Sequence, residues 1–131
     1  MFKKRIEHKE NFYKTIEQWW VDNDFPNIGF SAMPENIFIV SKDDVDLYAV
    51  PLYITDSSIC IIGFPTGNKT ADKEIKVGAL DFIIEEIKKD IKEIGYDTIL
   101  TASMNPKLMD LFVRCGFSVT DEGTTPYILN V

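Results

Sequence analysis

The sequence predicts an α/β (α+β) fold, with a mixed central sheet of about six to seven strands and helices on both faces. Three observations predict it. Three strand-like segments follow the first helical segment, a long amphipathic stretch occupies residues 70–94, and an apolar strand segment comes directly after that stretch. A helix that crosses between neighbouring parallel strands produces a sheet of this kind. The predicted order of elements is β-α-βββ-α-β-α-ββ.

Size and charge limit the classes of protein to consider. The chain has 131 residues, of which 45% are hydrophobic, so we expect a single domain over residues 1–131. No apolar run approaches the roughly 18 residues of a membrane span, and the basic N-terminus leads into polar residues rather than a secretory leader. The net charge of −7 argues against partners such as nucleic acid or an anionic membrane. The two cysteines lie in apolar contexts and favour free thiols in a reducing compartment, which predicts a cytoplasmic location.

The first third of the chain predicts a strand, a helix and a loop. Residues 2–7 form a short strand-like segment, and residues 12–21 show the spacing of an amphipathic helix with Asn11 as its N-cap. Residues 26–35 contain proline and glycine without a clear period, so they predict an ordered loop. The apolar positions of the helix fall on one face: Phe12, Ile16, Trp19 and Trp20.

A β-meander is predicted next. Residues 37–40, 46–55 and 59–64 are rich in β-branched and aromatic side chains and are separated by short polar turns. Pro51 lies inside the middle segment and has no N–H to donate. We therefore expect a bulge or an irregular pairing at that residue.

The last part of the chain alternates helices and strands. Residues 70–94 carry apolar side chains at three- and four-residue spacing, and Gly95 is placed to end this helix. Residues 96–101 follow as a strand. Asn105 and Pro106 are typical of the cap and first position of a helix, which Gly116 ends. Two final strands are expected at residues 117–120 and 127–131, joined by a turn that contains Gly123 and Pro126.

Three segments together resemble the GNAT superfamily of acyl-CoA N-acyltransferases. They are Ile-Gly-Tyr-Asp at 94–97, Ala-Ser-Met-Asn at 102–105 and Leu-Phe-Val-Arg-Cys-Gly-Phe at 111–117. Gln-Trp-Trp at 18–20, Met-Pro at 33–34 and residues 52–57 are similar, more narrowly, to small GNAT-like proteins encoded by tailed bacteriophages. The resemblance implies an acetyl-CoA-dependent N-acetyltransferase with a small-molecule or protein amine as acceptor. It also implies that the protein acts in the bacterial host cytoplasm if phage-encoded, and it is compatible with a homodimer.

The resemblance implies that acetyl-CoA lies between strands 59–64 and 96–101, along the backbone of the first. The pyrophosphate is expected at the start of the long helix. The implied cofactor-binding residues are Ile61, Ile62, Gly63, Phe64, Lys69, Thr70, Lys73 and Asn105. Residues 65–74 lack the family's pattern Arg/Gln-x-x-Gly-x-Gly/Ala. An alternative interpretation is therefore an ordinary helix start with solvated lysines, and a cap role for Asn105.

The residues that would move protons depart from the family's pattern. The family's acid is commonly a tyrosine at the position of Phe112, and its base is often a glutamate on the strand at residues 59–62, where this sequence has none. Tyr53 and Tyr127 are the catalytic candidates, and Glu35 and Asp56 are further carboxylates to consider. A single histidine and two distant cysteines predict no metal site.

Three functions remain open from the sequence. The first is acyl transfer to an amine. The second is a GNAT-fold binding protein that has lost catalysis, which the missing glycine pattern and Phe112 favour. The third is a phage-associated interaction or assembly protein, which only the narrower resemblance favours.

Overall fold

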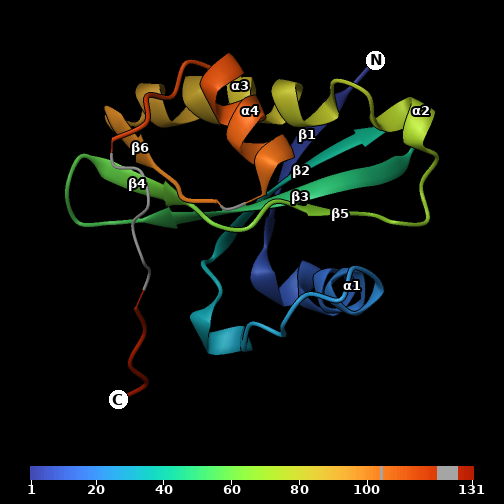
Figure 1. Ribbon diagram of the computed structural model, residues 1–131, viewed down its shortest axis with the longest axis horizontal. Helices are drawn as coiled ribbons and strands as arrows, with labels where there is room; N and C mark the ends of the chain where they lie inside the picture. The colour runs from blue at the N-terminus through green and yellow to red at the C-terminus, as the bar shows by residue number, and fades with distance from the viewer. Residues whose placement is uncertain (104, 121–126) are drawn as a thin grey trace.

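The computed structural model describes residues 1–103, 105–120 and 127–131 (Figure 1). Its sheet has six strands in the order β1-β2-β3-β4-β6, with β5 paired to β3. The strands are β1 (Lys3–His8), β2 (Asn36–Lys42), β3 (Val45–Ile54), β4 (Ile59–Ile62), β5 (Thr66–Gly67) and β6 (Thr98–Leu100). The helices are α1 (Lys9–Asp22), the 3-10 turn η1 (Phe30–Ala32), α2 (Lys73–Lys76), α3 (Ala79–Glu93) and α4 (Pro106–Arg114). The β4–β6 pair is parallel and the other pairs are antiparallel, so the predicted mixed sheet is confirmed.

Helices cover both faces of the sheet. Helices α3 and α4 lie on one face, and α1 with η1 lies on the other (Figure 1). Strand β2 shows why, because its side chains alternate between two buried clusters. Phe38 and Val40 pack in the cluster under α3, whereas Ile37 and Ile39 pack in the cluster under α1. A strand that is apolar at every position is thus buried from both sides, and the predicted three-layer arrangement is confirmed.

Pro51 is accommodated where β3 changes its partner. On one edge, β3 pairs with β5 through Tyr48 and Ala49 and with β4 from Leu52 onward, so Pro51 falls between the two ladders. The Pro51 carbonyl accepts a hydrogen bond from Gly63 N–H at 2.8 Å. The N–H that proline lacks points to this same edge, so no bond to β2 is lost. The predicted irregular pairing at Pro51 is thus confirmed on this edge. The β2–β3 ladder is regular at Pro51, and its register shift lies between Val40 and Ser41.

Helix α1 begins earlier than the sequence predicts. It starts at Lys9, and the cap is His8, whose Nδ1 accepts a hydrogen bond from Glu10 N–H at 3.2 Å. The prediction of Asn11 as N-cap is therefore wrong. Strand β1 runs directly into the helix, so the last residue of the strand supplies the cap.

The helix expected over residues 70–94 is interrupted. Helix α2 ends at Lys76, and α3 starts at Ala79 after Gly78, which has a left-handed φ of 83°. The prediction of one continuous helix is wrong at this point. Ile75 and Ala79 both contact the cluster under α3, so the apolar period continues across the break and conceals it.

The two predicted C-terminal strands do not form. Residues 117–120 and 127–131 have no strand assignment, and the turn predicted at 123–126 lies outside the described residues. Strand propensity needs a partner edge and a surface to cover. Tyr127, Ile128 and Leu129 are 92%, 88% and 82% exposed, so no burial stabilises a strand there. In the part of the chain that the structure describes, no helix has the length and apolarity to cross a membrane.

Candidate functional site

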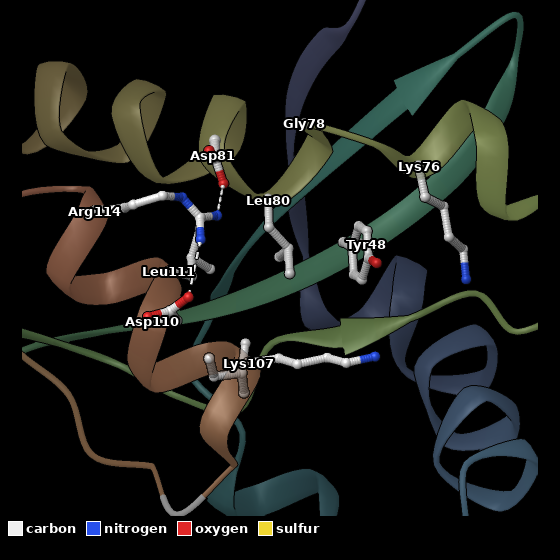
Figure 2. A pocket seen from close by; sticks show the side chains of 10 residues that line it. Tyr48, Lys76, Gly78, Leu80, Asp81, Lys107, Asp110, Leu111 and Arg114 are labelled. Atoms are coloured by element: carbon white, nitrogen blue, oxygen red, sulfur yellow. Dashed lines mark hydrogen bonds and ion pairs between the residues drawn. The ribbon is translucent and has the colours of Figure 1, made fainter.

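A basic cavity of about 280 Å³ lies between α3 and α4 (Figure 2). Its wall combines Gly78 and Leu80 at the start of α3, Leu111 from α4 and Tyr48 from β3. Three cationic side chains, Lys76, Lys107 and Arg114, share the lining with the carboxylates of Asp81 and Asp110. The lining thus carries more cationic than anionic side chains, although the whole chain has a net charge of −7. This local excess of positive charge favours binding of an anion.

The cations of the basic cavity are not equally available. Arg114 donates to Asp81 at 2.8 Å and lies 3.9 Å from Asp110, so carboxylates already hold it. Lys76 has a lowered pKa because burial disfavours its charged form, and nearby Lys73 adds repulsion. Its Nζ lies 5.4 Å from the centre of the Tyr48 ring. Lys76 and Lys107 are therefore the cations that an added anion can recruit.

The first turn of α3 adds backbone donors to the same wall. Gly78 precedes the helix and provides no side-chain cap. The first N–H groups of a helix have no partner inside it, and they form the positive end of the helix dipole. Gly78, Leu80 and Asp81 line the cavity, so this helix start faces it. Such an arrangement suits a phosphate group.

Sequence reasoning missed this position of the phosphate pattern. The segment Lys73-x-x-Lys76-x-Gly78 has the spacing of Arg/Gln-x-x-Gly-x-Gly/Ala, with lysine at the first two fixed positions and glycine at the last. The expectation at residues 65–74 follows from a helix capped by Thr70 or Asp72, and Asp72 is indeed the residue before α2. Gly78 inside the apolar period is the signal that could have corrected it.

The other residues expected at the phosphate site lie elsewhere. Lys69 Nζ donates to the Asp22 carbonyl at 3.0 Å, and the Thr70 hydroxyl bonds Asn68 Oδ1 at 2.8 Å. Neither lines the basic cavity. Asn105 caps α4, because its Oδ1 accepts from Lys107 N–H at 2.9 Å.

A second, apolar cavity of about 380 Å³ lies beyond the point where β4 and β6 stop pairing. The last paired residues are Ile61 and Leu100. The apolar cavity is lined by Tyr53, Ile61, Ile62, Gly63, Phe64 and Ala102. The structure thus brings together Tyr53 and the four residues of β4 and its end that the sequence analysis had linked to the cofactor.

The two cavities lie on opposite faces of the sheet. Leu52 and Ile62 are partners across β3 and β4 and belong to the cluster under α3. Their neighbours Tyr53 and Ile61, also partners, therefore face the α1 side. The Tyr53 hydroxyl confirms this placement, because it donates to the Ala32 carbonyl of η1 at 3.1 Å. Ligands could thus approach the end of β4 from either face.

Tyr53 is held closely against the end of β4. A Cβ added at Gly63 would lie 2.9 Å from Tyr53 Cε1, so only glycine allows this approach. Burial raises the pKa of the Tyr53 phenol, which keeps its proton at neutral pH. Its oxygen therefore presents lone pairs to the cavity side while its hydrogen is directed to Ala32.

Backbone donors near the apolar cavity differ in availability. Gly63 N–H is engaged with Pro51, whereas Phe64 N–H makes no hydrogen bond among the described residues. The Thr101 hydroxyl donates to the Ile62 carbonyl at 3.2 Å and links β4 to the segment after β6. Phe64 N–H is thus the nearest backbone group at the end of β4 that can bind a new acceptor.

The remaining candidates lie outside both cavities. Phe112 is buried in the core, with its ring centre 5.2 Å from that of Phe117. Tyr127 is almost fully exposed, and it lines neither cavity, as is also true of Glu35 and Asp56. Within residues 1–103, 105–120 and 127–131, no three His, Cys, Asp or Glu side chains are grouped as metal ligands.

Comparisons of the structure with known proteins identify the fold. An aminoglycoside acetyltransferase from an uncultured soil metagenomic sample, solved with trehalose, superposes with a TM-score of 0.72 at 9% identity, covering 99% of this chain and 97% of that chain. A GNAT-family acetyltransferase from Streptococcus pneumoniae gives 0.68 at 13% identity, covering 99% and 98%. A predicted acetyltransferase with acetyl-CoA from Clostridium acetobutylicum gives 0.65 at 12% identity, covering 97% and 96%.

Sequence comparison adds no assignment, since no family model and no curated protein matches the chain. The neighbours nevertheless align over nearly their whole length and agree with one another in kind. Their low identity limits the conclusion to architecture. The chain has the fold of the GNAT acetyltransferases.

Proposed function

We propose that this chain is an acyl-CoA-dependent N-acetyltransferase that acetylates an amine. The observation that carries the proposal is the pair of cavities on opposite faces of the sheet, one basic and one apolar. The basic cavity suits a phosphate-bearing donor, and the apolar cavity adjoins the end of β4. Direct transfer between two bound reactants needs such separate sites, because both must be held together at the moment of reaction.

Lys76, Lys107 and the start of α3 would hold the phosphates of acetyl-CoA. The uncapped N–H groups after Gly78 supply directed donors, and the two lysines supply charge. Asp81 weakens the site because it is a carboxylate in the first turn, although its bond to Arg114 offsets part of that charge. The backbone of Ile61, Ile62, Gly63 and Phe64 would then lie along the rest of the cofactor. Lys73, beside Lys76, would add charge at the edge of the basic cavity, whereas Lys69, Thr70 and Asn105 keep their other contacts.

The chemistry requires a thioester donor polarised at its carbonyl and an acceptor amine in its neutral form. When bound, acetyl-CoA supplies a thioester whose C–S bond breaks as the C–N bond forms, so that the amine loses one proton and the sulfur gains one. Phe64 N–H is the free donor that would stabilise charge on the carbonyl oxygen. Tyr53 oxygen can accept a hydrogen bond from the amine and orient it. No described lining residue is a carboxylate, so we assign removal of the proton to water. Tyr127 would need to move to take part.

The setting of this reaction is also a proposal. A neighbour in the comparisons was solved with the aminoglycoside sisomicin, which makes an amine acceptor reasonable for this chain too. We place the protein in the cytoplasm, in the host cytoplasm if the gene is phage-borne, as one domain over residues 1–131 with a homodimer as a compatible state. The buried thiols Cys60 and Cys115 suit that reducing environment.

Calorimetry with acetyl-CoA tests the proposal. Binding at micromolar to millimolar concentration is expected, and Lys76→Met should weaken it about tenfold, the effect of losing one charge-assisted contact. Lys14→Met, which removes an exposed lysine on α1, is the matched control and should leave the affinity unchanged. Absence of heat with millimolar acetyl-CoA would refute the proposed function.

A second function is a GNAT-fold binding protein without turnover. Two observations favour it: Phe112 is a buried ring rather than an acid, and none of the described residues that line the apolar cavity is a carboxylate. It predicts ligand binding at the same cavities with no amide product. Transfer of labelled acetyl groups to any amine in a broad panel would rule it out.

A further inference from the structure

We infer that the acceptor is an amine with one positive charge on an apolar or aromatic body, such as an arylalkylamine, and that the apolar cavity binds that body. This inference rests on the proposed function and specifies its acceptor. It concerns the cavity beside the end of β4 on the α1 face.

The lining of the apolar cavity offers no partner for a second positive charge. Among the described residues, Tyr53 is the single polar side chain of the lining, and the other lining residues are aliphatic, aromatic or glycine. A cation that leaves water without an anionic partner is strongly disfavoured. A polyamine would have to place additional ammonium groups against this lining, whereas the reacting nitrogen must in any case become neutral.

An aromatic wall makes the cavity suited to a flat apolar group. The Phe64 ring is 42% exposed, and its centre lies 5.2 Å from that of Phe25. Phe25 in turn lies 6.4 Å from Trp20, which is fully buried in the cluster under α1. The exposed Phe64 ring is therefore the outer member of a row of tilted aromatic rings that leads to the buried Trp20, and it can pair with a further ring.

A hydrogen-bonded link fixes the backbone of this wall. Trp20 Nε1 donates to Thr66 Oγ1 at 3.2 Å, and the Thr66 hydroxyl donates to the Phe64 carbonyl at 3.1 Å. The segment after β4 is thereby tied to helix α1. A cavity of about 380 Å³ corresponds to roughly a dozen water volumes, which accommodates a phenylethyl group.

The net charge of the whole chain and the lining of the apolar cavity predict different amine preferences. A net charge of −7 would attract polycations at long range, so charge alone predicts a preference for polyamines. The local lining predicts the reverse. The two expectations can be separated by comparing 2-phenylethylamine with spermidine.

The first measurement needs no acetyl-CoA. In ¹H–¹⁵N spectra of the full chain, 2-phenylethylamine should shift the amides of Ile61, Gly63 and Phe64, and spermidine should not. Phe64→Ala should raise the dissociation constant of 2-phenylethylamine about two- to tenfold, since one aromatic contact is lost. Val21→Ala, an exposed apolar truncation on α1, is the matched control and should leave it unchanged.

The second measurement is acetylation of each amine at saturating acetyl-CoA. A kcat/KM at least tenfold higher for 2-phenylethylamine supports the inference, and Ile61→Glu, which adds a carboxylate at a partly exposed lining position, should move the preference toward spermidine. Equal or better use of spermidine by the unmodified chain, or unshifted cavity amides with 2-phenylethylamine, overturns the inference while acetyl-CoA binding stands. If 2-phenylethylamine shifts the cavity amides but acetyl-CoA does not bind, the apolar amine site is supported and the proposed acetyl transfer is refuted.

Discussion

Replacing Gly78 by alanine should destabilise the fold by about 1–2 kcal/mol, the cost of a left-handed backbone for a residue with a Cβ. Gly78 has a φ of 83° at the junction of α2 and α3. A Cβ there would meet Phe2 Cε2 at 3.6 Å, which is ordinary van der Waals contact. The expected loss of stability therefore comes from backbone strain alone, because the added methyl group clashes with no neighbour.

Gly29 provides a matched control. It precedes η1 with φ −54° and ψ 149°, and nothing lies within 4 Å of an added Cβ. Alanine adopts this conformation without strain, so Gly29→Ala should leave stability unchanged or raise it by about 0.4–1 kcal/mol through the unfolded state. The two substitutions add the same methyl group in opposite backbone contexts.

Urea unfolding followed by tryptophan fluorescence measures both free energies, because Trp19 and Trp20 are buried in the cluster under α1. The difference between the two variants should be about 1–3 kcal/mol, the sum of the separate effects. Equal stabilities would show that the turn at Gly78 does not constrain the chain. Acetyl-CoA affinity should fall with Gly78→Ala and not with Gly29→Ala, since only the former alters the start of α3.

Two further predictions concern buried groups. Thr66→Val should cost about 1–3 kcal/mol in urea unfolding, because Trp20 Nε1 loses its acceptor in a buried site, and Thr66→Ser should recover most of the loss; a valine variant of full stability would contradict the assigned hydrogen bond. Burial raises the pKa of the Cys60 thiol in the folded protein above its pKa in the unfolded chain. The neutral thiol therefore contributes its full stabilisation at neutral pH, and this stabilisation is lost as the pH rises through the pKa of the folded state. Stability measured above about pH 8.5 should therefore decline less steeply for Cys60→Ala than for the unmodified chain, and parallel declines would refute this cause.

The strands up to β4 could be predicted because their signals are local. Runs such as residues 37–40 are β-branched or aromatic, and their polar turns are short, so each strand pairs with the one beside it in sequence. The parallel β4–β6 pair was also predictable, since a helix connects the two. A strand or helix is therefore predictable where the spacing of its apolar residues matches the surface against which it packs.

The break at Gly78 and the absent C-terminal strands depend on information that a local pattern does not contain. Helices α2 and α3 pack against the same apolar cluster. The spacing of apolar residues therefore continues from one helix to the next, although the backbone turns between them. Residues 127–131 have the alternation of a strand, but a strand forms only where an edge accepts it. The cofactor residues expected around Lys69 and Thr70 follow from a helix that starts near residue 70, whereas α2 starts at Lys73 and α3 at Ala79.

The residues at the end of β4 that the sequence singles out do line a cavity, but the face of the sheet on which it opens could not be predicted. Which side of the sheet Tyr53 occupies follows from its pairing with Ile61 and its bond to Ala32, and neither is visible in sequence. Register fixes such placement, since a shift of one residue would turn every side chain to the other face.

The placement of the two cavities on opposite faces of the sheet has a kinetic consequence for the proposed reaction. Each ligand has its own entrance, so neither must leave before the other arrives, and no covalent enzyme intermediate is needed to connect two half-reactions. Initial-rate plots should therefore show intersecting rather than parallel lines. A product amide can depart through the α1 side while spent thiol is still held beside α3, and release of the two products becomes independent.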